Sequence, residues 1–229
     1  MAQLKKIKEG ENFKVFNDGT SDLILVENVR VSFPSVGHMK EDEGDNGEIR
    51  RSYQSTPMLP KETHLAAKNA FVEIMNKLLT ANEAKVPPEY RCIKNGDDTE
   101  REEYQGHWVI ASSESRRPIA RDKRGVLYFD PEKIKDGAQA EAILDKIDDV
   151  FYGGVTVNIL LRPWYFNGKA KGKTKTYPKR ICCGFMGIQH VEDTPSFGQG
   201  RIDDTGVWGA VGDDDAGGDD GLGGDDDDL

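Results

Sequence analysis

The chain has few of the residues that bind metal ions or form crosslinks: three cysteines and four histidines among 229 residues. Two of the cysteines, Cys182 and Cys183, are adjacent, and adjacent residues of a strand point to opposite faces. Neither residue type shows the paired spacing that is typical of zinc sites, so we expect no metal, no cofactor and no disulfide framework. A chain without disulfides favours a reducing compartment such as the cytoplasm.

Long apolar runs are also missing. No stretch of about 18 apolar residues occurs, so we expect no membrane-spanning helix. The first residues, MAQLKKIKEGENFKVF, lack an apolar core followed by a small-residue cleavage site, which argues against a signal peptide. The sequence has no glycine-rich phosphate loop, nucleophile elbow or HExxH motif, and we therefore expect a protein that is not an enzyme.

Acidic charge is abundant, but the excess is confined to the C-terminal end. The chain holds 31 basic and 41 acidic residues, and residues 201–229 alone contain eleven Asp and one Arg. Subtraction leaves 30 of each sign in residues 1–200, so the body of the chain is balanced. Aspartate and glycine cannot bury enough apolar surface to offset chain entropy. We predict a folded domain over residues 1–200 and a disordered acidic tail over residues 201–229.

Periodic patterns predict a mainly β domain with two helices. Residues 23–33 alternate at period two, and one face of the expected strand carries Leu23, Leu25, Val29, Val31 and Phe33. Further strands are predicted at 49–59, 107–112, 126–129, 155–162 and 177–190, with a loop at 34–48. Helical spacing of apolar residues predicts helices at 61–79, opened by Pro60, and at 138–149.

The order of these elements predicts an OB-fold, which is a five-stranded, partly open Greek-key barrel. Its helix usually lies between the third and fourth strands, and the helix at 138–149 falls in that position. The helix at 61–79 would then be an addition packed on the outside. Gly153 and Gly154, just before the fourth strand, suit the sharp bend that a small barrel requires. A generic α+β sheet protein is the alternative.

The segment between the last two strands, residues 162–180, combines positive charge with aromatic rings and has no acidic residue. Three consecutive aromatics cannot all face a core, because successive strand residues alternate sides, so at least one is exposed. Exposed rings stack on unpaired bases, and lysines bind phosphates with release of counterions. The candidate DNA-binding residues here are Trp164, Tyr165, Phe166, Lys169, Lys171, Lys173, Lys175, Tyr177, Lys179 and Arg180.

Two further basic clusters can line the same groove if the fold brings them together. They are Arg50, Arg51 and Tyr53 on the second strand, and Arg116 and Arg117 in the central turn. Taken alone, each cluster is more simply interpreted as a solvated face. Their assignment to DNA binding therefore depends on the three-dimensional arrangement.

The end of the tail couples a run of charge to one apolar residue. Its candidate partner-binding residues are Asp225, Asp226, Asp227, Asp228 and Leu229. Such a segment can occupy the domain's own cationic groove and compete with DNA. When DNA displaces it, the segment can dock on a basic pocket of another protein, with the leucine as anchor.

Several segments together resemble the phage-encoded single-stranded DNA-binding proteins, among them the class that short-tailed coliphages use in replication. The matching segments, from residue 22 onward, are VRVSFP, YQGHWVIASSESRRP, FYGGVTVNILLRPWYFNG and KRICCGFMGIQHVED, followed by the acidic end. The resemblance implies an OB-fold, sequence-tolerant binding of single strands, and roles in DNA replication, recombination and repair. It also implies a tail that recruits polymerase or helicase–primase in the cytoplasm of the infected bacterium. The coliphage class closes its tail with an aromatic residue, whereas this chain ends in Leu229.

Two other classes of function are weighed against this one. An acidic interaction protein or DNA mimic would use the tail and ignore DNA, but the cationic segment 162–180 argues against it. A metal-dependent nuclease would need a carboxylate set such as Asp122, Asp130 and Glu132, which no catalytic motif accompanies. A homodimer is left open.

Overall fold

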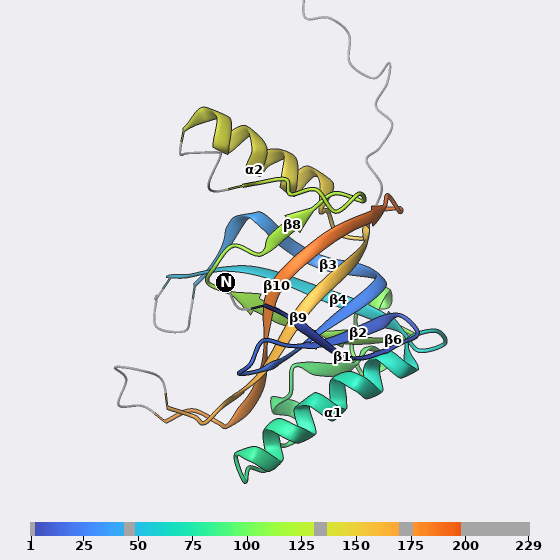
Figure 1. Cartoon of the computed structure of the whole chain (residues 1–229), viewed down its shortest axis with the longest axis vertical. Helices are drawn as coiled ribbons and strands as arrows, with labels where there is room; N and C mark the ends of the chain where they lie inside the picture. The colour runs from blue at the N-terminus through green and yellow to red at the C-terminus, as the bar shows by residue number, and fades with distance from the viewer. Residues whose placement is uncertain (1–2, 44–48, 131–136, 170–175, 198–229) are drawn as a thin grey trace, which may run out of the picture. The chain divides into compact units, whose positions relative to one another are not determined.

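Long, curved strands form most of the structure (Figure 1). A computed structural model describes residues 3–43, 49–130, 137–169 and 176–197. The long strands are β3 (Asp22–Glu43), β4 (Ile49–Pro60), β9 (Thr156–Phe166) and β10 (Arg180–Glu192). The short strands are β1 (Lys5–Gly10), β2 (Phe13–Asn17), β5 (Ile93–Asn95), β6 (His107–Ile110), β7 (Ser112–Glu114) and β8 (Ile119–Arg121). The helices are α1 (Leu65–Ala81), α2 (Ala138–Val150) and the 3₁₀ turns η1 (Pro88–Tyr90), η2 (Gly96–Asp98) and η3 (Glu102–Tyr104).

The strands curl into a partly open barrel. They follow the order β5-β6-β4-β3-β9-β10-β8, β7 pairs with β4, and the β1–β2 hairpin joins β3. A parallel bridge between Arg91, just before β5, and Ile181 on β10 brings the β5 end of this path to β10. The mainly β architecture with two helices confirms the predicted fold class. No helix in the described part of the chain is long and apolar enough to cross a membrane.

Strand β3 departs from simple alternation at two bulges. Its pairing shifts between Val26 and Val29 against β9, and again just beyond Ser32 against β4. Asn28 and Phe33 adopt positive φ values of 55° and 48° at these places, and each bulge turns the following residues. The prediction that Phe33 faces the core is therefore wrong, since its side chain is 49% exposed. The loop predicted from residue 34 is also wrong as far as Glu43, because β3 continues through it.

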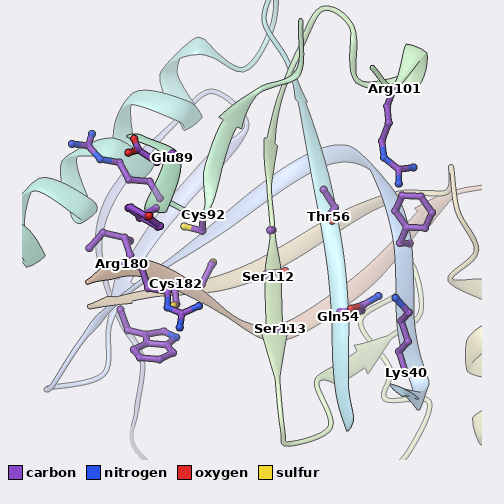
Figure 2. Close-up of a pocket in the computed structure, with 17 residues that line it drawn as sticks. Lys40, Gln54, Thr56, Glu89, Cys92, Arg101, Ser112, Ser113, Arg180 and Cys182 are labelled. Atoms are coloured by element: carbon purple, nitrogen blue, oxygen red, sulfur yellow. The ribbon is translucent and has the colours of Figure 1, made fainter. Parts of the chain in front are cut away.

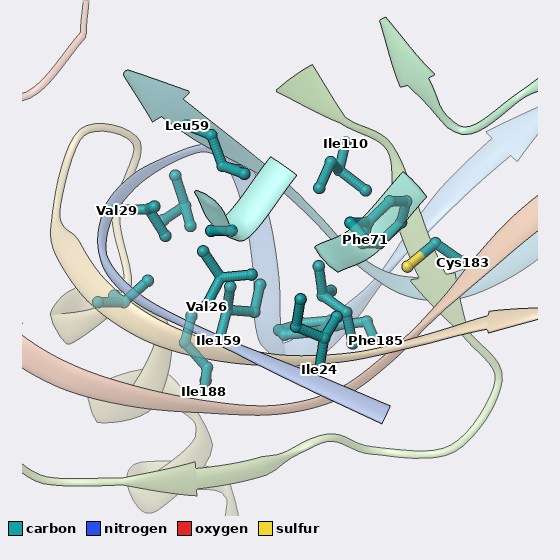
Figure 3. Close-up of a cluster of buried hydrophobic side chains, with 14 of the residues drawn as sticks. Ile24, Val26, Val29, Leu59, Phe71, Ile110, Ile159, Cys183, Phe185 and Ile188 are labelled. Atoms are coloured by element: carbon teal, nitrogen blue, oxygen red, sulfur yellow. The ribbon is translucent and has the colours of Figure 1, made fainter. Parts of the chain in front are cut away.

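Helix α1 supplies part of the barrel core. It begins four residues after the predicted opening, because Pro60 ends β4 and its carbonyl accepts the His64 N–H at 2.9 Å. Its predicted apolar face is correct, and that face packs against the barrel strands. Phe71 is fully buried and lies close to Ile110 and Cys183 in Figure 3. The buried residues of α1 are Ala67, Ala70, Phe71, Ile74 and Met75.

Helix α2 has the predicted bounds to within a residue, and it packs on β3 at the opposite side of the barrel from α1 (Figure 1). Its buried face carries Ala140, Leu144 and Ile147. The contact with β3 is backbone to backbone: a Cβ added at Gly37 would lie 2.2 Å from the Leu144 carbonyl oxygen. Glycine at this position therefore allows the helix to approach the strand closely.

Two turns near the barrel rim differ in how well the sequence predicts them. Gly154 adopts φ 112°, which confirms the sharp bend expected before β9. The strand expected at 126–129 is wrong, because the chain there forms a turn beyond β8. Asp122 fixes this turn by accepting the N–H groups of Arg124 at 2.9 Å and Val126 at 2.8 Å.

Candidate nucleic-acid interface

A groove of about 610 Å³ crosses the face of the barrel, with β3, β4 and β7 on one side and β9 and β10 on the other. Figure 2 shows Lys40 and Arg101 at one end and Arg180 and Cys182 at the other. We call the first end, with Phe33, Lys40 and Arg101, the Phe33 end. We call the second end, with Tyr90, Arg91, Trp164 and Arg180, the Trp164 end.

The groove contains aromatic rings that face solvent. Phe33 is 49% exposed, Tyr90 42% and Trp164 43%. In the described part of the chain, these are the only three aromatic side chains in the exposed class, and all three line the groove. Burying an aromatic ring is one of the largest apolar gains a fold can make, so three exposed rings in one groove indicate a binding surface.

The groove is also cationic. It is lined by four basic side chains, Lys40, Arg91, Arg101 and Arg180, and by one acidic side chain, Glu89. Arg180 lies over the Phe166 ring at 4.9 Å from its centroid, and Arg101 lies over the Phe33 ring at 4.5 Å. Guanidinium groups that stack on rings keep their N–H donors at the edge, where a phosphate can accept them. The groove therefore offers rings and phosphate donors side by side.

Local structure positions the two outermost rings. Phe33 points outward because the second bulge of β3 gives it a positive φ just before Pro34. Trp164 points outward because of the pleat of β9, since Pro163 before it is buried and Tyr165 after it is partly buried. The Trp164 ring packs edge-to-face on Phe166, with centroids 6.2 Å apart and planes at 86°. The strand registers thus hold both rings at fixed places.

The floor between the two ends is made of small polar side chains. Ser112 and Ser113 of β7 lie in the middle of Figure 2, and Thr56 of β4 lies beside them. The Ser112 hydroxyl donates to the Ser55 carbonyl at 2.6 Å, so it is already satisfied within the sheet. Short side chains leave room for a ligand backbone to approach the sheet, and they do not select one ligand shape over another.

The cysteines at the Trp164 end do not have the character of nucleophiles. Burial raises the pKa of the Cys182 thiol. Burial, together with a hydrogen bond to Cys92, raises the pKa of the Cys183 thiol well above its ordinary value. The thiols therefore stay protonated near neutral pH and act as neutral lining, since thiolates are the reactive form.

The predicted residues of segment 162–180 divide between the groove and its surroundings. Trp164 and Arg180 line the groove. Tyr165 packs against the core, and Phe166 is half-buried below Arg180. Three others lie beyond the groove, namely Lys169 and Lys179, which are exposed, and Tyr177, which is half-buried. Lys171, Lys173 and Lys175 lie outside the described residues, as do Asp225–Leu229 of the tail.

The other two basic clusters do not line the groove. Arg51 forms an ion pair with Glu41 at 2.6 Å, while Arg50 is exposed on β4. Tyr53 is 5% exposed, and Arg117 covers its ring at 5.8 Å from the centroid. Arg116 is exposed beside it. A role for these residues in DNA binding stays a prediction, but the ring of Tyr53 is not accessible to a base.

Sequence reasoning missed most of the groove. The overlooked residues are Phe33, Lys40, Tyr90, Arg91 and Arg101. One local signal was available: the double proline Pro87–Pro88 opens a short 3₁₀ turn, PEY, which cannot bury every side chain that it carries. For Arg101 and Lys40 there is no local signal, because only the folded barrel brings them together.

Residues 22–216 match the family described as "Enterobacter phage Enc34, ssDNA-binding protein". Among solved structures, the single-stranded DNA-binding protein from bacteriophage Enc34 is 27% identical with a TM-score of 0.67, covering 90% of this chain and 98% of that one. That phage protein in complex with ssDNA matches at 27% identity and TM-score 0.69, covering 86% and 100%. Bacteriophage T7 gp2.5, a single-stranded DNA binding protein, reaches 11% identity and TM-score 0.47 over 84% and 98%, too distant to bear on the site. No curated protein sequence matches this chain significantly.

Proposed function

The chain belongs to the family of Enc34-type phage ssDNA-binding proteins, and on that basis we propose that it binds single-stranded DNA in the groove between the Phe33 and Trp164 ends. The observation that carries this proposal is the coincidence of every exposed aromatic residue of the described chain with one cationic groove. Unpaired bases present the faces that such rings stack on, whereas duplex DNA keeps them inside.

The groove's chemistry favours binding that tolerates any sequence. Bases stack on the exposed rings at about 1–3 kcal/mol each, and every base has a face to offer. Phosphates accept hydrogen bonds from Lys40, Arg91, Arg101 and Arg180, which positions the strand without reading it. The serine floor accommodates the sugar backbone. No step of this binding breaks a bond, so the proposed activity is non-enzymatic.

The nuclease alternative requires Asp122 as a metal ligand, but this carboxylate is already engaged within its own turn. Asp122 accepts two backbone N–H groups of its own turn, and the Val126 N–H is the main cause that lowers its pKa. Its carboxylate therefore maintains the turn beyond β8 rather than facing a substrate. Asp130 lines a separate apolar pocket with Ile119 and Phe129, and Glu132 lies outside the described residues.

We further propose that the acidic end of the chain competes with DNA for this groove and recruits replication or recombination proteins once DNA displaces it. Charge supports this role. Residues 201–229 carry a net charge of −10, while the groove carries four basic groups against one acidic group. The apolar Leu229 beside four aspartates suits a basic pocket with an apolar floor on another protein. The setting would be DNA replication, recombination and repair in the infected cell.

The first experiment is fluorescence anisotropy with labelled oligo-dT of about 30 nucleotides, compared with the same length of duplex, at about 50 and 200 mM salt. The full chain is compared with a version that ends at residue 200. We expect both versions to prefer the single strand, the shorter one to bind more tightly, and affinity to fall steeply with salt.

A matched pair of substitutions identifies the groove. Arg180→Gln removes a cation at the Trp164 end, and Lys146→Gln removes an exposed cation of α2 outside the groove. The first should weaken binding and the second should leave it nearly unchanged. If neither version of the chain binds single strands at low salt, the proposal is wrong, and the tail becomes the place to look for function.

A further inference from the structure

A second cluster of polar side chains lies where α2 packs on β3, apart from the groove. The His38 Nε2 atom is 3.1 Å from a Glu141 carboxylate oxygen and 3.9 Å from an Asp145 carboxylate oxygen. Glu141 and Asp145 are four residues apart, so they project from the same face of α2. We propose that His38, Glu141 and Asp145 bind one divalent transition-metal ion, with zinc as the working probe.

The spacing of the ligand atoms fits such an ion. One nitrogen and two carboxylate oxygens lie within 4.8 Å of one another. Zinc binds imidazole nitrogen at about 2.0–2.1 Å and carboxylate oxygen at about 2.0–2.2 Å, so neighbouring ligands of a tetrahedral ion are about 3.4 Å apart. The two measured separations from Nε2 fall on either side of this value, and rotation of the exposed carboxylates would bring them to it.

A third carboxylate orients the histidine. Asp148 lies 2.7 Å from His38 Nδ1, and because an ionised carboxylate only accepts, Nδ1 carries the proton. The Asp148 carboxylate also accepts the backbone N–H groups of Val36 at 3.2 Å, Gly37 at 2.7 Å and His38 at 3.0 Å. These bonds hold both the carboxylate and the ring, so Nε2 faces Glu141 and Asp145. A carboxylate behind a ligating histidine is the common second layer of metal sites.

Charge balance at the cluster favours a cation. In the described part of the chain, the only ion-pair partner of Glu141 and of Asp145 is the same Nε2 atom. Because ionised carboxylates only accept, the metal-free Nε2 donates its proton to Glu141, and the resulting cation still faces three carboxylates. A divalent ion that displaces this proton would balance more of their charge. The mixture of imidazole and carboxylate ligands suits zinc, cobalt or nickel, whereas magnesium and calcium favour oxygen ligands alone.

The ion would add a further link between two elements that hydrogen bonds to Asp148 already join. His38 belongs to β3, and the carboxylates belong to α2. Lys40, two residues further along β3, lines the groove at the Phe33 end. A bound ion would therefore brace the strand that carries Lys40, although the site itself does not touch the groove.

The test is a zinc titration of the full chain in competition with a chromophoric chelator, because the aspartate tail also attracts divalent ions weakly. The comparison includes the double variant Glu141→Gln/Asp145→Asn and the matched control Asp149→Asn, which removes an exposed carboxylate of α2 outside the cluster. We expect one tight equivalent of zinc for the wild type and the control, and affinity weaker by more than about 10-fold for the double variant. Cobalt should give a visible absorption band with the same pattern.

Loss of folding is separated from loss of binding by the far-UV circular dichroism of each metal-free variant. A second variant, His38→Gln, removes the nitrogen ligand and should also lose the tight equivalent. In nuclear magnetic resonance spectra, zinc should shift the Nε2 resonance of His38 in the wild type. If the tight equivalent survives in the double variant, or if the wild type binds only several ions weakly, the proposal is overturned.

Discussion

The two ends of the groove hold the same kinds of residue, but they differ in how those residues are engaged. At the Phe33 end, Lys40 pairs with Asp42 at 2.7 Å, and Arg101 pairs with Glu103 at 3.4 Å while covering the Phe33 ring. At the Trp164 end, Arg180 stacks on Phe166, and the acidic residue there, Glu89, forms no ion pair with any residue that the structure describes. A cation that must leave a carboxylate to meet a phosphate gains less than one that has no such partner. We therefore expect the Trp164 end to dominate affinity.

The largest effect should come from Trp164→Ala, which removes the exposed ring at the stronger end. Loss of one stacked base of about 1–3 kcal/mol predicts binding to oligo-dT that is about 5- to 150-fold weaker. Trp164→Phe should recover most of the affinity, because it keeps a face for stacking. Anisotropy titrations at one salt concentration measure both. Equal affinities for the alanine variant and the wild type would remove Trp164 from the interface.

The second test is Phe33→Ala at the weaker end. Arg101 already lies over one face of this ring, so only the other face is available to a base without rearrangement. We expect a loss of about 3- to 10-fold, smaller than for Trp164→Ala. The same titration checks it, with thermal unfolding as a control for folding. A larger loss than for Trp164→Ala would reverse the ranking of the two ends.

The third test compares the salt dependence of Arg180→Gln and Lys40→Gln. Each phosphate contact contributes about 0.7 to the slope of log affinity against log salt for single strands. Arg180→Gln should lower the slope by about this amount. Lys40→Gln should lower it less, because Lys40 begins in an ion pair with Asp42. Slopes that fall equally would show that the ion pair does not matter.

The smallest effect should come from Asp42→Asn, which releases Lys40 from its partner. An exposed ion pair contributes at most about 1 kcal/mol, so we expect binding to tighten by about 2-fold. The gain should disappear at about 200 mM salt, where exposed charges are screened. Weaker binding after this substitution would mean that Asp42 positions the lysine rather than competing for it.

The sequence predicted the Trp164 end better than the Phe33 end for a physical reason. Three consecutive aromatics on an alternating strand require that one be exposed, and Trp164 is the one. The same alternation gave the wrong direction for the Phe33 side chain. Two bulges with positive φ turn β3, and a period-two pattern of apolar residues does not reveal bulges. Local spacing therefore predicts a side chain's direction only where a strand stays regular.

The core shows the same limit. The apolar face of α1 follows from helical spacing, but its place in the barrel does not. Phe71 is buried against strands that are distant in the sequence, so only the tertiary fold could place it. Likewise, His38 and the α2 carboxylates are about 100 residues apart, which hides the cluster from any search for short ligand spacing.

The bridge between Arg91, just before β5, and Ile181 on β10 forms a seam of the barrel, and both residues also line the groove. A DNA strand held by Arg91 and Arg180 would span this seam. DNA binding would then stabilise the closed barrel, so binding and barrel closure would be coupled. Opening of the seam should then slow in the presence of DNA, and the backbone amides around Ile181 should exchange with deuterium more slowly. The protein would thus be most resistant to heat and proteases while DNA is bound, and less resistant once the DNA has dissociated.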